Sequence, residues 1–275
     1  MKPHFKPKNQ YLFARIIISL RWRLLSPKKP KIIDTSHHLI SLGSKYGRKT
    51  FCNIFPVDKN LNVISAGVGE DISFDVEFLN NFKAFIILVD PTPIAIQHVE
   101  MIKDRLGLDS IDQYSPNGRQ SVNSYNLTKV TRNNLILVPQ ALWKNQGLLR
   151  FHLPPNESRD SSGSINSIHN LYRTSEKQIT VKTTTVLKIC NKFRLDKVDI
   201  LKLDIEGSAL EVLGSMFSDS IYPIQILLEI DEMHFPSFRS KYRAFKLFRL
   251  MKKNNYVIVN QDSCDFTFIR KDYME

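Results

Sequence analysis

The chain has 275 residues, of which 42% are hydrophobic and 24% are charged. This is ordinary globular usage, so a core of useful size can form without disulfides or metal staples. Its three cysteines, Cys52, Cys190 and Cys264, are odd in number and lack C-x-x-C spacing. They suggest neither a disulfide framework nor a zinc site, and they favour a reducing, cytoplasmic compartment.

The net charge of +12 is concentrated at the start of the chain. Nine of the 39 basic residues precede the first acidic residue, Asp34. The remainder carries 30 basic against 27 acidic residues, a balance of only +3. We therefore predict no broad phosphate-binding face on the main domain, and we do not expect nucleic acid as a partner.

The sequence divides into a basic leader, residues 1–33, and a single domain, residues 34–275. Residues 11–20 of the leader are apolar but are interrupted by Arg15. They are too short for a membrane span, which needs about 20 apolar residues, and no small-residue cleavage site follows. Residues 1–31 are interpreted either as a basic segment on an anionic membrane surface or as a terminal helix packed on the domain.

Short apolar runs rich in β-branched residues predict buried strands, and helix-compatible stretches lie between them. The alternation predicts an α/β fold with a doubly wound, mostly parallel sheet and a terminal antiparallel strand pair. The predicted strands are 62–66, 85–89, 135–138, 198–203, 225–230, 256–259 and 266–269, and the predicted helices are 92–106 and 206–217. The polar stretch 154–173 is predicted to be an active-site lid or a flexible linker.

A glycine turn, Gly67-Val-Gly69, ends the first of these strands, and Asp90 ends the next. Glycines allow a ligand to approach the backbone closely, and a carboxylate there can accept hydrogen bonds from ribose hydroxyls. The pair indicates an adenosine-type ligand, although a glycine here is often only a tight turn.

The residues after the turn indicate which adenosine-type ligand fits the site. A dinucleotide fingerprint requires glycine at position 72, where the chain has Ile72, and Glu70 and Asp71 would repel a pyrophosphate. S-adenosylmethionine carries a sulfonium and an ammonium instead of phosphates, so Glu70 is compatible with it. We predict this cofactor, although both acids also suit a helix start.

A second constellation, Asp204, Glu206 and Gly207, follows the predicted strand 198–203. In open α/β sheets ligands bind beyond the carboxyl ends of strands, so these carboxylates are expected to face the cleft. Lys202, inside the same buried strand, needs a polar partner, and Asp204 is one candidate.

Three segments, 62–75, 89–93 and 199–207, together resemble the FkbM family of methyltransferases. The resemblance implies a class I methyltransferase fold, S-adenosylmethionine as donor, and O-methylation of sugars or polyketide-type compounds. It places Gly67, Gly69 and Asp90 at the cofactor, and Asp204 and Glu206 near the methyl group or the acceptor. Relatives often have Glu-x-His after the fifth strand, whereas this chain has Glu229-Ile-Asp231, with His234 three residues beyond.

An alcohol is a poor nucleophile at neutral pH, so a base or a metal is expected at the acceptor. The candidate bases are Asp204, Glu206 and His234. Alternatively, Asp204, Glu229 and Asp231 would hold Mg²⁺, which prefers carboxylate oxygens.

The predicted function is methylation of a hydroxyl on a sugar, a glycan or a related small molecule. The alternatives are an RNA methyltransferase, a nicotinamide-dependent oxidoreductase, and a catalytically inactive, membrane-associated binding module of the same fold. Cofactor binding distinguishes the oxidoreductase from the other classes. Methyl transfer distinguishes an active enzyme from the inactive binding module. The sequence leaves the acceptor and the oligomeric state open.

Overall fold

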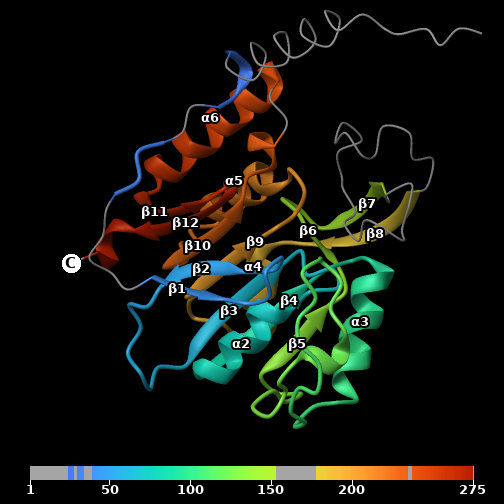
Figure 1. Ribbon diagram of the computed structural model, residues 1–275. Coiled ribbons are helices and arrows are strands. Elements are labelled where there is room, and N and C mark those ends of the chain that lie inside the picture. Colours follow the sequence, from blue (N-terminus) through green and yellow to red (C-terminus); the bar gives the residue numbers. More distant parts are fainter. Residues whose placement is uncertain (1–23, 28–29, 34–38, 153–177, 235–236, 275) are drawn as a thin grey trace, which may run out of the picture.

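A seven-stranded sheet forms the centre of the protein, with the order β11-β12-β10-β9-β3-β4-β5 (Figure 1). The computed structural model describes residues 24–27, 30–33, 39–152, 178–234 and 237–274. The strands are β3 (Leu61–Ala66), β4 (Ala84–Val89), β5 (Leu135–Val138), β9 (Ile200–Leu203), β10 (Gln225–Glu229), β11 (Tyr256–Asp262) and β12 (Asp265–Arg270). Strands β5, β4, β3, β9 and β10 pair in parallel, whereas β12 runs antiparallel between β10 and β11. The predicted mostly parallel sheet and its terminal antiparallel pair are confirmed.

Helices cover both faces of this sheet. Alternate residues of β3 face opposite ways, so Val63 packs with α2 and α3, whereas Ile64 packs with α4, α5 and α6. The helices are α2 (Ser73–Asn81), α3 (Pro93–Lys103), α4 (Val186–Phe193), α5 (Ala209–Ser218) and α6 (Phe238–Lys253), and the short 3-10 helices are η1 (Val122–Ser124), η2 (Asp231–Met233) and η3 (Lys271–Tyr273). The predicted helices 92–106 and 206–217 correspond to α3 and α5.

Local sequence explains where several helices begin. Thr92 caps α3 by accepting a hydrogen bond from the Ala95 amide, and Pro93 occupies the first helical position. Thr185 caps α4 and Ser237 caps α6 in the same way. Helix α3 starts directly after β4, and its cap lies beside Asp90.

Two small sheets complete the described part of the chain. Strands β1 (Leu39–Leu42) and β2 (Lys49–Cys52) form an antiparallel hairpin, which the Gln225 side chain fastens to β10 through both backbone groups of Cys52. Strands β6 (Ala141–Leu142), β8 (Gln178–Thr184) and β7 (Gly147–His152) form the other sheet. Neither sheet was predicted from the sequence.

Some predictions fall outside the described residues. The stretch 154–173 and most of the leader lie there, so the lid or linker and the division at residue 33 stay predictions. Within the part of the chain that is described, no helix is both long and apolar enough to cross a membrane. Cys52, Cys190 and Cys264 are buried and free.

Candidate functional site

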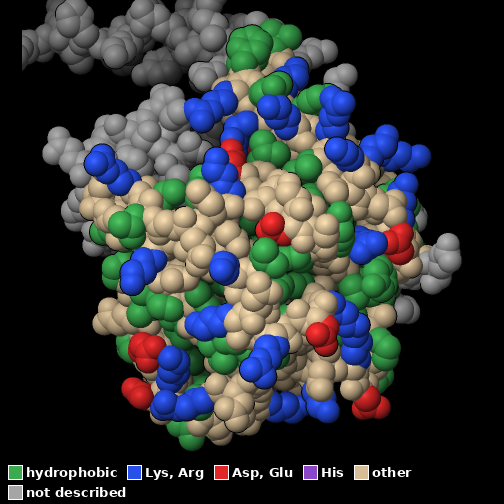
Figure 2. All heavy atoms as spheres, turned by 180° about the vertical axis from the view of Figure 1, so that it is seen from behind, with side chains coloured by type: hydrophobic (Ala, Val, Ile, Leu, Met, Phe, Trp, Pro, Cys, Tyr) green, Lys and Arg blue, Asp and Glu red, His purple; other side chains and the backbone are tan. Residues whose placement is uncertain are grey.

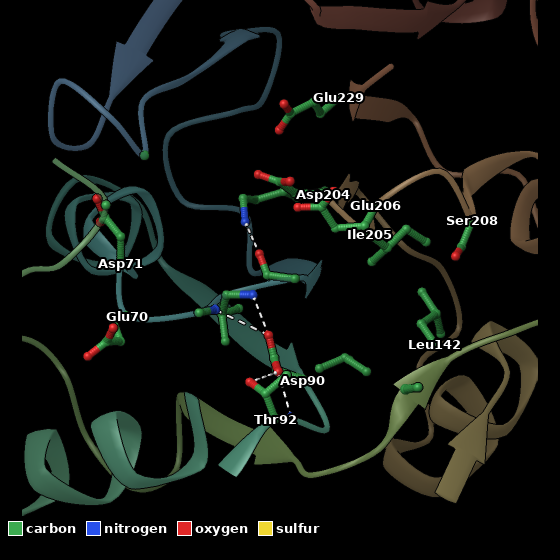
Figure 3. A pocket seen from close by; sticks show the side chains of 18 of the residues that line it. Glu70, Asp71, Asp90, Thr92, Leu142, Asp204, Ile205, Glu206, Ser208 and Glu229 are labelled. Carbon is green, nitrogen blue, oxygen red and sulfur yellow. Dashed lines mark hydrogen bonds between the residues drawn. The ribbon is translucent and has the colours of Figure 1, made fainter. Parts of the chain in front are cut away.

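A cavity of about 350 Å³ opens at the carboxyl ends of β3, β4, β9 and β10. This volume lies within the roughly 300–1,000 Å³ of small-molecule sites. In Figure 3, Asp90 and Thr92 lie on one side, and Asp204, Glu206 and Glu229 lie on the other. The predicted residues from these strand ends thus line one pocket.

Gly67 occupies the closest backbone contact in the site. Its φ is +74°, and a Cβ there would lie 1.6 Å from the Asp204 carbonyl oxygen. The Gly67 amide donates to the Val89 carbonyl at 3.1 Å, and the Asp204 amide donates to the Ala66 carbonyl at 3.0 Å. The turns after β3 and β9 therefore pack backbone against backbone, which only glycine allows at this position.

Asp90 holds the glycine turn from β4. Its Oδ2 accepts hydrogen bonds from the amides of Val68 at 3.0 Å and Gly69 at 3.2 Å. Its Oδ1 accepts two more from Thr92, from the amide at 2.8 Å and from the hydroxyl at 2.6 Å. Four donors fill the acceptor capacity of a carboxylate. A ribose hydroxyl would have to replace one of them.

Glu70 and Asp71 fasten neighbouring loops to the turn. Glu70 pairs with Arg119 at 2.8 Å, and a single parallel bridge joins the two residues. Asp71 accepts from the Ser44 hydroxyl at 2.6 Å and from the Gln120 amide group at 3.1 Å. Both acids therefore hold structure around the pocket that they line.

The turn after β9 is strained. Glu206 has a φ of +47° and Gly207 has +75°, so two consecutive residues adopt the left-handed conformation. This costs about 1–2 kcal/mol for a residue with a side chain. The Gly207 amide donates to Asp231 Oδ2 at 2.5 Å, and Ser208 is the N-cap residue of α5. The strain sets the Glu206 carboxylate at the pocket wall.

Lys202 lies in β9 and is buried, as the sequence indicated. Its ammonium group donates to the Gly67 carbonyl at 3.0 Å. Its direct hydrogen-bond partner is therefore the glycine turn, whereas Asp204 is affected through its charge. The lysine adds a third link between β9 and the turn after β3.

Lys49, at the start of β2, is the centre of the acidic side of the pocket. Its ammonium nitrogen lies 3.2 Å from Asp204, 3.7 Å from Glu229 and 2.5 Å from Asp265, and only 5% of its side chain is exposed. Sequence reasoning missed this residue, because a single lysine in a short strand carries no chemical pattern. Its three partners are 155 to 216 positions away in the sequence.

The predicted magnesium site formed by Asp204, Glu229 and Asp231 is not supported. Among the described residues, no group of three or more His, Cys, Asp or Glu side chains could hold a metal ion. The Lys49 ammonium stands between the first two carboxylates, and Asp231 accepts from the Gly207 amide instead. The prediction identified two of the clustered carboxylates, Asp204 and Glu229, but neither Asp265 nor the cation that balances them.

The titrating groups of the cluster differ from one another. Burial alone would raise the pKa of Asp204, but Lys49 and Lys202 lower it to about 2. The Asp204 charge, together with burial, raises the pKa of Glu229 to about 8. Contacts with Cys264 and Glu229 raise the pKa of His234, which lies 3.3 Å from Glu229, to about 10. At neutral pH Asp204 is ionised, and Glu229 is the group closest to its titration point.

Comparison with known proteins sets the class and the family. The model of the methyltransferase FkbM domain matches residues 47–258, which is most of the chain. The protein is therefore a methyltransferase by class. It belongs to the FkbM methyltransferase family, in agreement with the resemblance found in the sequence. A search of curated proteins finds no match.

The contact at Gly67 predicts a severe effect of Gly67→Ala. The new methyl group would collide with the Asp204 carbonyl and force a left-handed alanine. We expect destabilisation of at least about 3 kcal/mol, measured by urea unfolding. The control is Gly214→Ala in α5, where a Cβ meets nothing within 4 Å and helix propensity should stabilise by about 1 kcal/mol. Equal stability of the two variants would contradict the packing described here.

We predict that removal of the Lys49 cation lowers the stability of the fold by an amount that depends on pH. Lys49→Met leaves Asp204, Glu229 and Asp265 without their common counter-ion, at a cost of about 3–5 kcal/mol at neutral pH. The loss should shrink as pH falls towards about 2, the pKa of Asp204 beside Lys49, because protonation of Asp204 removes the charge that Lys49 balances. Urea unfolding at several pH values measures it, with exposed Lys83→Met as control. A loss that does not depend on pH would refute the electrostatic explanation.

Proposed function

We propose that the protein is an S-adenosylmethionine-dependent O-methyltransferase of class I fold that acts on a hydroxyl of a neutral sugar, glycan or related small molecule. One observation carries the proposal: a glycine turn and a cluster of carboxylates line a single cavity. Family membership supports the donor, since methyltransferases commonly use S-adenosylmethionine.

The glycine side of the pocket fits the cofactor. Gly67 and Gly69 have positive φ and carry no side chain, so a ligand can approach their backbone. The Ser208 hydroxyl lines the pocket and is buried without a hydrogen-bond partner among the described residues, which suits a polar ligand group. When bound there, the cofactor supplies a methyl group on a good leaving group. Glu70 lies where its charge favours a sulfonium or an ammonium.

The acidic side of the pocket fits a hydroxyl acceptor. We assign Glu229 as the general base, because a raised pKa near neutrality suits proton removal from an alcohol. The ionised Asp204 and the carboxyl group of Glu206 would accept hydrogen bonds from the acceptor and orient it. A cationic His234 has no free lone pair for a proton, so we place it as a partner of Glu229 and not as the base.

The charge of this side limits the acceptor. Asp204, Glu206, Glu229 and Asp265 line it, and buried Lys49 is the counter-ion of Asp204, Glu229 and Asp265. A phosphate or carboxylate on the acceptor would meet the ionised Asp204 at short range, where repulsion is strong. Neutral polyhydroxyl compounds instead supply donors for the carboxylates. The same repulsion disfavours the RNA methyltransferase alternative.

Calorimetric titration with S-adenosylmethionine, S-adenosylhomocysteine and NAD⁺ examines the donor. We expect binding of the first two only, weakened at least about tenfold by Asp90→Ala because the glycine turn loses its support. Asp104→Ala, on the exposed end of α3, is the matched control. Binding of NAD⁺ alone would establish an oxidoreductase. A folded protein that binds none of the three would favour the inactive module.

The assignment of Glu229 predicts a pH profile. The ionised fraction of Glu229 grows as pH rises, so methyl transfer to a neutral sugar should increase up to about pH 8 and then level off. Glu229→Gln should lower kcat about 10²–10⁴-fold and remove this rise. Glu100→Gln, on the exposed face of α3, is the control. A rise that persists in Glu229→Gln would assign the base to another group.

A further inference from the structure

Helix α6 (Phe238–Lys253) has an unusual composition for a domain of balanced charge. Seven of its 16 residues are Lys or Arg, and none is acidic. Residues 34–275 together carry only three more basic than acidic residues. The helix is therefore a concentrated basic element on a domain whose other residues include slightly more acidic than basic side chains.

The inner face of α6 is fixed by the core and by one arginine. Ala244, Leu247 and Met251 are buried. Arg243 donates to Glu211 at 2.7 Å, to Glu232 at 2.8 Å and to the Gly207 carbonyl at 2.6 Å. These contacts determine which side of the helix faces water.

The outer face consists of aromatic and basic residues alone. Phe238, Tyr242 and Phe245 are 80%, 58% and 61% exposed, and their spacing of four and three residues places them in one stripe. The exposed positions of α6 are Phe238, Arg239, Tyr242, Phe245, Lys246, Arg249, Lys252 and Lys253. In Figure 2 hydrophobic and basic side chains gather at the upper end of the molecule, where α6 lies.

Charge identifies what covers this face. Leu24, the first described residue, lies beside α6, since Lys241 donates to the Leu24 carbonyl at 2.9 Å. Residues 1–23 contain six basic and no acidic residues, so they would bring like charge against α6. A second copy that paired α6 with α6 would do the same. An anionic partner is required.

We propose that the outer face of α6 docks on an anionic phospholipid surface. Exposed aromatic rings flanked by lysine and arginine are the residues by which interfacial helices enter the headgroup region. The exposed stripe lies on a single convex helix, a shape that can contact a flat membrane surface. Single-stranded nucleic acid instead binds in grooves that track its backbone. Residues 1–23, with six basic residues, directly precede Leu24, which contacts Lys241 of α6, and their charge favours the same surface.

Co-sedimentation of the full chain with vesicles examines this docking. We expect binding to phosphatidylcholine vesicles that contain phosphatidylglycerol, little binding to phosphatidylcholine alone, and release by high salt. Lys246→Glu/Arg249→Glu and, separately, Phe238→Ser/Tyr242→Ser/Phe245→Ser should each weaken binding at least about tenfold.

The matched control is Lys188→Glu/Lys192→Glu, which makes the same charge change on the exposed side of α4. It should bind vesicles as the unmodified chain does, and all variants should keep the unmodified unfolding midpoint. The proposal is overturned if both α6 variants still bind, or if neutral vesicles bind equally well. It is also overturned if the chain binds polyuridylic acid but no vesicle, which would make α6 a nucleic-acid surface.

Discussion

The site depends on one contact between two backbone turns. At Gly67 the turn after β3 approaches the Asp204 carbonyl so closely that no side chain fits between them. Lys202 reaches across to the Gly67 carbonyl, and Asp90 holds the next two amides from the other side. Because these links join adjacent parallel strands, they fix the separation between the glycine turn and the acidic side of the pocket. Under the proposed function this would align donor and acceptor, and alignment of two reactants is a major source of rate in bimolecular chemistry.

The second organising element is a cation and not a turn. Lys49 draws carboxylates from three separate strand ends to one point and fastens the β1–β2 hairpin over them. A buried lysine without such partners would lose its charge, and the carboxylates without the lysine would repel one another. The unequal pKa values of Asp204 and Glu229 follow from this arrangement. The basic outer face of α6 lies apart from it, whereas Arg243 on the inner face of the helix donates to the Gly207 carbonyl beside the pocket.

The sequence predicted what local patterns encode. Apolar runs located the seven strands of the large sheet, and strand ends located Gly67, Asp90, Asp204 and Glu206 in one pocket. Contacts between residues far apart in the chain could not be predicted from the sequence. Nothing local marks Lys49 as the partner of Asp265, and the composition of an acidic cluster does not distinguish a metal from an ammonium. The four donors that fill Asp90 likewise come from turn geometry that only the fold reveals.

Glu206 shows how such a site limits the stability that substitutions can add to the protein. Its left-handed backbone is one that glycine adopts freely and glutamate does not. A sequence chosen for stability alone would place glycine at both 206 and 207, and it would lose a carboxylate from the pocket wall. The most thermostable member of a mutant library is therefore not expected to be the most active. If Glu206 orients the acceptor as proposed, the glutamate serves activity at the expense of a weaker fold.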